Sequence, residues 1–356
     1  MTGPGRQAQL IGTGLIGASI GLGLRHVGWT VTGRDLDEAT GEAALAVGAI
    51  DRIGRNPDAD LVIVSVPSGS AVQAVEEALR EHPRAAVTDV ASVKASITEA
   101  VEAPRFVGGH PMAGSEQDGV AGADPSMFLG AVWVLTPSDR TDPDAFALVH
   151  GMVTSLGADV VSLPAPEHDL MVAMVSHVPH LTAATLMSLA SRRSEDHAAL
   201  LRLAAGGFRD MTRIAAGSSA IWPDICADNS AAICDVLDDL IAELQGVRTV
   251  VETADREGLV ARLEQARAAR TNLPLRAVGA ADLVEMRVSV RDEPGQLSLV
   301  TTTATGVGAN ILDIEIAHSA EGDRGVLVLV VERPAAERLA AALLVHGLVV
   351  SIGQLP

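Results

Sequence analysis

One histidine in this chain lies where a proton acceptor could reach a bound substrate. It is His110, in the segment Gly-Gly-His-Pro-Met-Ala-Gly-Ser-Glu at residues 108–116. Glycine and proline make such a segment turn-prone and let the backbone approach a ligand closely. A neutral imidazole can take a proton from a hydroxyl near neutral pH, so the segment predicts proton-transfer chemistry. The alternative is a histidine that makes only a structural hydrogen bond in the loop.

Two further histidines, His177 and His180, are three residues apart. In a helix this spacing places both on one face. Pro179 lies between them, and because proline is tolerated in the first turn, it predicts that a helix begins here. The pair could contact a substrate or hold a metal ion, or one member could be structural. No third ligand follows at a typical metal spacing, although His168-Asp169 lies nearby, so we expect no metal.

A glycine-rich stretch near the N-terminus has the spacing of a dinucleotide-binding loop. It reads Gly-Thr-Gly-Leu-Ile-Gly at residues 12–17, follows a predicted strand and opens a predicted helix. The glycines allow a tight turn, close approach of a pyrophosphate, and close packing of helix on strand, while the helix N-terminus attracts phosphate. We expect five residues of the loop to contact the cofactor: Gly12, Gly14, Leu15, Ile16 and Gly17. The alternative is a structural glycine turn that binds no nucleotide.

An acidic residue lies where such loops need one. Asp35 lies just after the second predicted strand, 23 residues beyond Gly12, where a carboxylate can accept both ribose hydroxyls. Its charge would repel the 2′-phosphate of NADP, which favours NAD. The neighbouring Arg34 could instead serve a phosphate or stack on adenine. Ser65, at the end of the third predicted strand, and Pro67, just after it, complete the predicted cofactor contacts.

The elements that must position these residues follow from the hydrophobic pattern. Over residues 8–165 short β-rich runs alternate with helical stretches, which predicts an α/β Rossmann-type domain with a mostly parallel sheet and helices on both faces. The candidate strands cover residues 8–11, 30–33, 61–65, 86–89, 106–108 and 131–136.

The rest of the chain divides into two further regions. Residues 167–270 are rich in Ala, Leu and Met, and the segment 225–255 has apolar positions at helical spacing, which predicts an all-helical domain. Its apolar positions exceed what one small bundle needs, so part of it is expected to face another subunit. Residues 282–356 then predict the order β-α-β-β-α-β, a ferredoxin-like α+β domain. The expected domains are residues 1–165, 166–272 and 280–356.

Composition excludes several classes of function. The formal net charge of −19 argues against a nucleic-acid partner, because phosphates call for clustered Lys and Arg. Cys226 and Cys234 have neither metal-site nor disulfide-framework spacing, so reduced thiols are expected. The N-terminal residues lack the apolar stretch of a signal peptide, and the longest apolar runs are strand-sized. We therefore expect a soluble, cytoplasmic protein with no membrane partner.

Several short motifs follow one another along residues 7–270. They read GTGLIGAS (12–19), DVASVK (89–94), GGHPMAGSE (108–116), HD (168–169), SHVPH (176–180) and GGFRDMTRIA (206–215), with Trp222 after them. Together they resemble the prephenate/arogenate dehydrogenase family of tyrosine biosynthesis. The C-terminal region looks like an ACT domain, a regulatory module attached to some members.

The resemblance implies NAD-dependent oxidative decarboxylation of prephenate to 4-hydroxyphenylpyruvate. It makes His110 the catalytic histidine and places Ser92 near it, where the hydroxyl could hold the imidazole tautomer or contact the substrate. Arg213 matches an arginine that binds a substrate carboxylate, which suits its planar fork. The other implied substrate contacts are His177, His180, Ser115, Glu116 and Trp222. Glu116, Arg209 and Asp210 match positions near the pocket mouth and could form a charged gate.

Three alternatives remain open. Arogenate dehydrogenase activity would give tyrosine instead, and neutral Ser115 favours prephenate only weakly. A β-hydroxyacid-type dehydrogenase would use a lysine on its helical domain, but residues 167–269 contain none. A non-catalytic nucleotide and amino-acid sensor would not need a proton acceptor beside nicotinamide.

The C-terminal region carries its own candidate site. Asp292 and Gly295 belong to a loop that joins a predicted strand to a helix, and Asn310 precedes the next strand. By resemblance to ACT domains, these three residues could bind an aromatic amino-acid effector. The alternative is a domain that only assists oligomerisation, and a homodimer is expected in either case.

Overall fold

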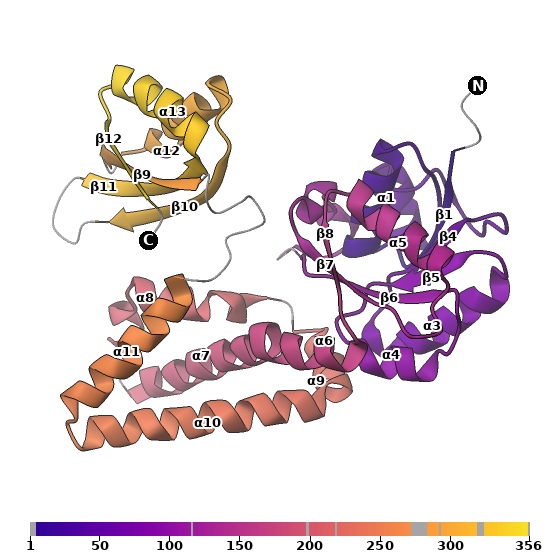
Figure 1. The fold of residues 1–356 in the computed structure, drawn as a ribbon, viewed down its shortest axis with the longest axis horizontal. Coiled ribbons are helices and arrows are strands. Elements are labelled where there is room, and N and C mark those ends of the chain that lie inside the picture. Colours follow the sequence, from indigo (N-terminus) through magenta and orange to yellow (C-terminus); the bar gives the residue numbers. More distant parts are fainter. Residues whose placement is uncertain are drawn as a thin grey trace. The chain divides into compact units, whose positions relative to one another are not determined.

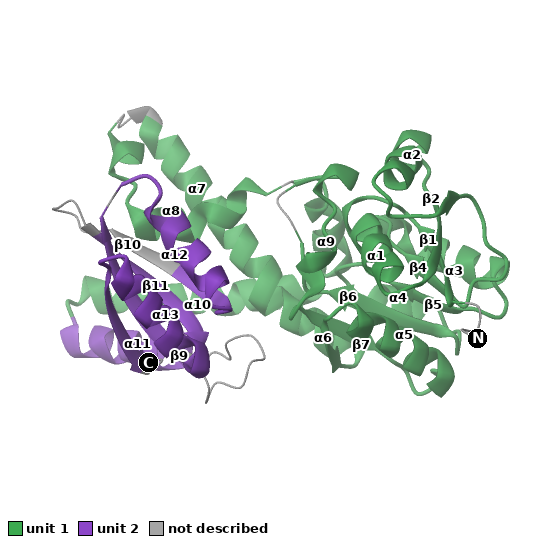
Figure 2. Ribbon diagram, turned by 90° about the horizontal axis from the view of Figure 1, so that it is seen from above, with its two compact units in different colours: residues 1–254 green, residues 255–356 purple. Residues whose placement is uncertain are grey.

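The computed structural model describes residues 5–114, 117–196, 199–217, 219–271, 283–291, 293–318 and 324–354. These residues form two compact units, residues 1–254 and 255–356, each of which is described by itself (Figure 2).

The first unit begins with an eight-stranded sheet in the order β3-β2-β1-β4-β5-β6-β7-β8 (Figure 1). Its strands are β1 (Gln7–Ile11), β2 (Thr30–Arg34), β3 (Arg52–Ile53), β4 (Leu61–Val64), β5 (Ala86–Asp89), β6 (Phe106–Pro111), β7 (Val132–Thr136) and β8 (Asp159–Ser162). The strands from β3 to β6 are parallel, and β7 is antiparallel to β6. The strand order reverses beside β1, and open α/β sheets bind ligands at the carboxyl ends of the strands beside such a reversal. The sheet confirms the predicted Rossmann-type fold, and β3 and β8 are additional to the predicted strands.

Alternating side chains explain why helices cover both faces of the sheet. In β4, Leu61 and Ile63 join one buried core, whereas Val62 and Val64 join the other. The first core includes α1 (Leu15–His26) and α5 (Pro143–Ser155), and the second includes α3 (Ser68–Glu81) and α4 (Ala95–Ala100). A further helix, α2 (Glu38–Ala46), follows β2. A strand buried on both faces is expected to be uniformly apolar, as the sequence Leu-Val-Ile-Val is.

The remainder of the first unit is helical. It comprises α6 (Ala165–Val172), a π-helical turn (Ala173–His177), α7 (Val178–Asp196), α8 (Gly206–Thr212), α9 (Trp222–Asp228) and α10 (Ser230–Glu252). Short 3-10 turns lie at Leu200–Leu203 and Arg213–Ala216. The π turn, α7 and α10 share a small buried core. The helices α7 and α10 are drawn in Figure 1. The helical domain predicted from the sequence is therefore confirmed.

Two details of the helical region differ from the prediction. Pro179 does not begin a new helix, because α6, the π turn and α7 are contiguous. Proline has no N–H for the α-helical ladder, and a π turn directly before it accommodates that gap. The predicted helix 225–255 is also interrupted at Asn229, whose side chain bonds to another element.

One helical run among the described residues, Ala165–Ser194, is long and apolar enough to cross a membrane by length and composition alone. The longest uninterrupted apolar runs of the sequence are strand-sized, so no helix of this kind was predicted. The run also carries His168, Asp169 and His177, which are buried and hydrogen-bonded within the unit. Buried polar groups with protein partners are typical of a helix in a folded domain.

The second unit contains the predicted α+β domain. Its elements are α11 (Arg256–Thr271), β9 (Leu283–Arg291), α12 (Gln296–Gly306), β10 (Ile311–His318), β11 (Arg324–Glu332), α13 (Arg333–Val345) and β12 (Val349–Gln354). The sheet is antiparallel in the order β10-β11-β9-β12. Alternate residues of β9, Met286 and Val288, pack with Val300 of α12 and Leu339 of α13. The ferredoxin-like arrangement is confirmed, while the three predicted domain boundaries stay predictions.

Candidate active site

The sheet brings the predicted cofactor and catalytic residues to one edge. Because β1, β2, β4, β5 and β6 are parallel, their carboxyl ends meet there. The glycine loop follows β1, Arg34 ends β2, Ser65 follows β4, and His110 is the penultimate residue of β6. Ligands of open α/β sheets bind in the crevice at this edge, beside the reversal of strand order.

The glycine loop fits a dinucleotide. Gly12 has a φ of +88°, and a Cβ built on it would lie 2.0 Å from the carbonyl oxygen of Ser65. A Cβ on Gly17 would lie 2.2 Å from the carbonyl oxygen of Gly12. Gly14, directly before α1, has open space where its Cβ would be, and Leu15 and Ile16 open the helix. The loop therefore packs tightly on its inner side and leaves room for a pyrophosphate at the helix N-terminus.

The residues after β2 are prearranged for a ribose. Asp35 accepts hydrogen bonds from the backbone N–H of Thr13 (2.7 Å) and of Asp37 (3.1 Å), which hold its carboxylate at the loop. A carboxylate with these two bonds still has lone pairs for ribose hydroxyls.

The other predicted cofactor residues lie near this carboxylate or before α3. Arg34 forms an ion pair with Glu81 of α3 (2.9 Å). Leu36 is fully exposed beside Asp35, which suits apolar contact with a purine ring. Pro67 directly precedes α3.

His110 belongs to a chain of hydrogen-bonded groups. Its Nδ1 lies 2.9 Å from Nε2 of His168, and Nδ1 of His168 lies 2.7 Å from Oδ1 of Asp169. Both His168 and Asp169 are buried on α6. The helical region thus supplies the partner of a histidine on the sheet edge, His168, and the carboxylate that holds this partner, Asp169.

The order of these groups assigns the tautomers. An ionised carboxylate only accepts, so His168 donates from Nδ1, and its Nε2 in the neutral ring is an acceptor. His110 must then donate from Nδ1 to His168, which leaves its own Nε2 unprotonated. This nitrogen can accept a proton from a substrate. The residue bonded to Nδ1 of His110 is His168, so His168 and not Ser92 holds the tautomer in this structure. A contact of the half-buried Ser92 with substrate stays a prediction.

Asp169 also fixes the segment that holds Ser92. Its two oxygens accept from the backbone N–H of Lys94 and of Ala95, both at 2.8 Å, at the start of α4. The side chain of Lys94, the one lysine in the sequence, is fully buried and paired with Asp89. Asp89 in turn accepts from the backbone N–H of Gly109 (3.2 Å), next to His110. Buried charges that are paired in this way define a rigid frame around His110.

The second histidine cluster forms around Trp222. His180 stacks on the indole with ring centroids 3.8 Å apart, and His177 meets it edge-on at 6.1 Å. Nδ1 of His177 lies 3.2 Å from Nδ2 of Asn229, whose amide also donates to the backbone oxygen of Asp169 (2.8 Å). The structure therefore brings together all three residues predicted here, and it adds Asn229.

Burial keeps these histidines neutral. It lowers the pKa of His110 well below its ordinary value, and the neighbouring His168, Lys94 and His177 lower it further. Burial lowers the pKa of His177 to about 4, against the opposing influence of Asp169. Burial also lowers the pKa of His180. Neutral imidazoles near pH 7 can act as hydrogen-bond acceptors and donors without adding charge.

Other predicted site residues are less fully defined. Arg213 begins a 3-10 turn that ends near His180, because a Cβ built on Gly217 would lie 3.9 Å from Cε1 of that ring. Ser115 and Glu116 lie outside the described residues. Arg209 and Asp210 are exposed on α8, so the charged gate stays a prediction.

In the second unit, Gly295 precedes α12 with a φ of +96°, and Asn310 is exposed before β10. Asp292 lies outside the described residues. Within the ranges that the structure describes, no group of three His, Cys, Asp or Glu side chains is placed to hold a metal ion.

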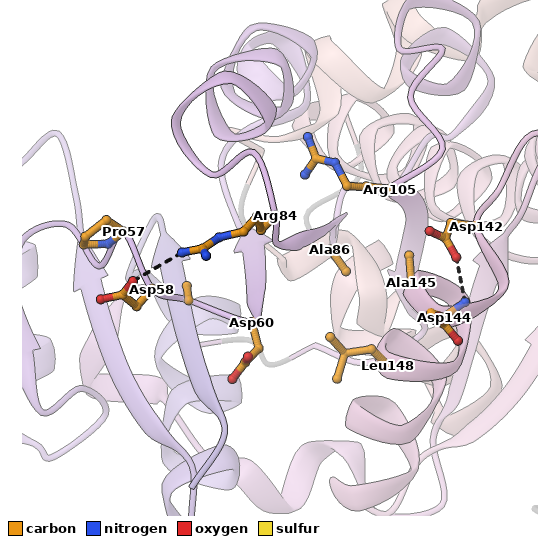
Figure 3. Close-up of a pocket in the computed structure, with 11 residues that line it drawn as sticks. Pro57, Asp58, Asp60, Arg84, Ala86, Arg105, Asp142, Asp144, Ala145 and Leu148 are labelled. Carbon is orange, nitrogen blue, oxygen red and sulfur yellow. Dashed lines mark hydrogen bonds and ion pairs between the residues drawn. The ribbon is translucent and has the colours of Figure 1, made fainter. Parts of the chain in front are cut away.

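A cavity of about 450 Å³ lies at the opposite edge of the sheet (Figure 3). It is lined by residues that precede β4, β5 and β6 and begin α5, including Asp60, Arg105 and Asp142. Arg105 donates to the backbone oxygens of Leu79 and His82, near the C-terminal end of α3. The cavity therefore lies at the other end of the strands from the glycine loop and His110.

The sequence did not predict the roles of three residues of the site: His168, Asp169 and Asn229. His168 and Asp169 were noted as a motif and weighed only as metal neighbours, although adjacent His and Asp can form a donor–acceptor pair. Asn229 had no sequence signal, since its role depends on where α6 and α10 meet.

A doubly wound sheet with a glycine loop and a buried histidine at its carboxyl edge, joined to a helical region, defines a dinucleotide-dependent dehydrogenase. Comparison with known proteins narrows this class. Residues 20–162 match the family model "Prephenate dehydrogenase, nucleotide-binding domain", and residues 164–265 match "Prephenate dehydrogenase, dimerization domain". The chain therefore belongs to the prephenate dehydrogenase family, as the motifs predicted.

Individual relatives agree with this assignment. The prephenate dehydrogenase of Bacillus subtilis is 35% identical, over 89% of this chain and 90% of its own. The prephenate dehydrogenase of A. aeolicus, solved with hydroxyphenyl propionate and NAD+, is 27% identical with a TM-score of 0.71, over 76% of this chain and 98% of its own. The arogenate dehydrogenase of Synechocystis is 29% identical with a TM-score of 0.66, over 74% and 98%. The predicted oxidoreductase class and NAD-binding fold are confirmed.

Proposed function

We propose that this protein catalyses the NAD-dependent oxidative decarboxylation of prephenate to 4-hydroxyphenylpyruvate. The observation that carries the proposal is the hydrogen-bonded chain from His110 through His168 to Asp169, at the same sheet edge as the glycine loop. This chain leaves Nε2 of His110 as the proton acceptor. The similarity to the prephenate dehydrogenase of Bacillus subtilis supports the choice of substrate.

The residues divide the chemistry between them. NAD, held by the glycine loop and Asp35, would accept a hydride from the carbon that bears the substrate hydroxyl. Nε2 of His110 takes the proton of that hydroxyl, while Nδ1 remains bonded to His168. Asp169 stabilises the positive charge that develops on the two rings. CO2 departs from the ring, and the electrons of the broken C–C bond make the ring aromatic, which supplies much of the driving force. The phenolate oxygen formed in this way takes the proton back from His110, so the product is the phenol.

Arg213 is proposed to bind the side-chain carboxylate of the substrate. A strong ion pair with the ring carboxylate would stabilise the ground state of the group that must leave as CO2, which would slow the reaction. The side-chain carboxylate stays intact, so a bidentate guanidinium contact costs nothing in the transition state. The turn that begins at Arg213 ends near His180, which supports its place at the substrate site.

Arogenate is the second candidate substrate. It carries an ammonium where prephenate carries a keto oxygen, and a carboxylate near that position would favour it. The similarity to the arogenate dehydrogenase of Synechocystis supports keeping this alternative.

We further propose a soluble, cytoplasmic homodimer whose ACT-like C-terminal unit binds an aromatic amino acid through Asp292, Gly295 and Asn310. The match to a dimerization domain and the exposed apolar side chains of α10 support the dimer. The ferredoxin-like order of the second unit supports the regulatory assignment. Titration of the full chain with tyrosine during turnover tests the effector.

The central experiment follows formation of NADH by the full chain with prephenate, arogenate and a 3-hydroxyacid in turn. We expect turnover with prephenate and none with the 3-hydroxyacid. A higher kcat/KM with arogenate than with prephenate would show that arogenate is the preferred substrate. Tight binding of NAD without turnover of prephenate or arogenate would favour the alternative of a non-catalytic nucleotide and amino-acid sensor.

A further inference from the structure

Asn229 is a buried amide at the break between α9 and α10, and it contacts two other elements. It is 5% exposed, and its Nδ2 lies 2.8 Å from the backbone oxygen of Asp169 and 3.2 Å from Nδ1 of His177. Its backbone N–H and C=O are used in the helices, by Ile225 and Ile233. The side chain is therefore left to join α6 to the π turn.

The two contacts of Asn229 decide which nitrogen of His177 carries a proton. A backbone carbonyl only accepts, so the amide atom facing Asp169 must be the NH2 group. That nitrogen has no lone pair to offer, so it must also donate to Nδ1 of His177. A neutral imidazole that accepts at Nδ1 carries its proton at Nε2.

The surroundings of His177 are consistent with a neutral ring. It is 2% exposed, packs edge-on against Trp222, and its burial lowers the pKa to about 4. It is also linked to His110 by hydrogen bonds: Asn229 bonds to the backbone of Asp169, whose carboxylate bonds to His168, the partner of His110. The two rings therefore serve one site.

We propose that Asn229 is a positioning residue that locks His177 as a hydrogen-bond donor through Nε2. This inference rests on the proposed function and deepens it. The site then pairs an accepting histidine, His110, with a donating histidine, His177. A neutral donor can hold a substrate oxygen without placing a second cation beside the carboxylate that leaves as CO2.

The first test reads the tautomer directly, without cofactor or substrate. The full chain, labelled with 15N in its histidines, is studied by long-range 1H–15N NMR near neutral pH, and the His177 signals are assigned from their loss in His177→Gln. We expect the pattern of a neutral ring protonated at Nε2. A ring protonated at Nδ1, or a cationic ring, would overturn the proposal.

The second test uses Asn229→Asp. Its carboxylate oxygen can only accept, so the proton of His177 should move to Nδ1, and kcat/KM for prephenate should fall about 10- to 100-fold. The matched control is Asn56→Asp, a buried asparagine that bonds to Gln7 and Gln9 near the opposite edge, and it should keep the wild-type rate.

The outcomes separate this inference from the proposed function. Wild-type turnover in Asn229→Asp would overturn the positioning role. Failure of the wild-type chain to oxidise prephenate would remove the proposed function, while the NMR result would still decide the tautomer. If Asn229→Asp does not fold, the wild-type spectrum alone decides.

Discussion

At the scale of single residues, the chemistry depends on which ring nitrogens carry protons. His110 accepts because His168 and Asp169 occupy its other side, and these partners come from α6 and not from its own loop. A glycine-rich loop alone would leave the ring free to adopt either tautomer. The role proposed for His110 as proton acceptor therefore depends on two regions of the chain packed together.

Replacing His110 with asparagine tests the proton acceptor. We expect kcat for prephenate to fall about 10²- to 10⁴-fold, because general-base assistance is lost. The Kd for NAD, measured by calorimetry, should stay within about 2-fold, because the dinucleotide is held by other residues. His26→Asn, at an exposed histidine, serves as control. Loss of NAD binding with unchanged turnover would show that the role is wrong.

Replacing His168 with asparagine tests the tautomer assignment. The variant keeps a polar side chain but loses the link to Asp169, so we expect kcat to fall about 10- to 100-fold with little change in KM. The pH profile of kcat should also change, because the charge developing on His110 is no longer shared. A variant with wild-type kcat and pH profile would contradict the assignment.

The burial of His177 predicts a pH-dependent stability. Unfolded, this ring takes up a proton near its ordinary pKa of 6.5, whereas folded it stays neutral down to about 4. Below pH 6.5 the unfolded state therefore binds more protons, and the free energy of unfolding falls by at most about 1.4 kcal/mol per pH unit until about pH 4. This contribution is fully present above pH 6.5. The free energy of unfolding, measured with urea across this pH range, should depend less steeply on pH in His177→Gln than in the wild type. An equal pH dependence in the two proteins would refute the prediction.

At the scale of elements, the parallel strands decide where chemistry can occur. Their carboxyl ends collect the glycine loop, Asp35 and His110 from segments far apart in the sequence. The ion pair between Arg34 of β2 and Glu81 of α3 has a second consequence. It holds the one basic side chain next to Asp35 on another partner, which favours a cofactor without a 2′-phosphate.

Replacing Asp35 with serine tests this view of cofactor choice. The ribose acceptor and its negative charge are both lost, so the Kd for NAD should rise about 10-fold while the Kd for NADP falls. Glu81→Gln in the same background frees Arg34 and should improve NADP binding further. Asp58→Ser, at an exposed aspartate near the opposite edge, is the control. Unchanged relative affinities would refute the ribose assignment.

At the scale of the whole molecule, the exposed apolar side chains need an explanation. On α10, Ile241, Leu244 and Val251 are 50%, 56% and 61% exposed in the single chain. Their spacing places them along one side of the helix, which is the pattern of a contact surface. The family's dimerization domain includes this helix.

Charged substitutions on α10 test the dimer. We expect Ile241→Asp with Leu244→Asp to convert the dimer to a monomer in sedimentation experiments at micromolar concentration, because buried carboxylates without partners are costly. Glu243→Ala, at an acidic residue of the same helix, should leave the dimer intact. A double variant that sediments like the wild type would place the interface elsewhere.

The sequence by itself determined the class of fold, and it predicted the glycine loop, Asp35 and His110 as site residues, because each depends on local patterns of residue type and spacing. It also predicted the order of the elements in both units, since alternation and helical periodicity are written along the chain. Only the tertiary structure decided the partners of the site histidines and the break at Asn229. Hydrogen bonds between residues 58 or 60 positions apart follow from packing, and packing leaves no local signal.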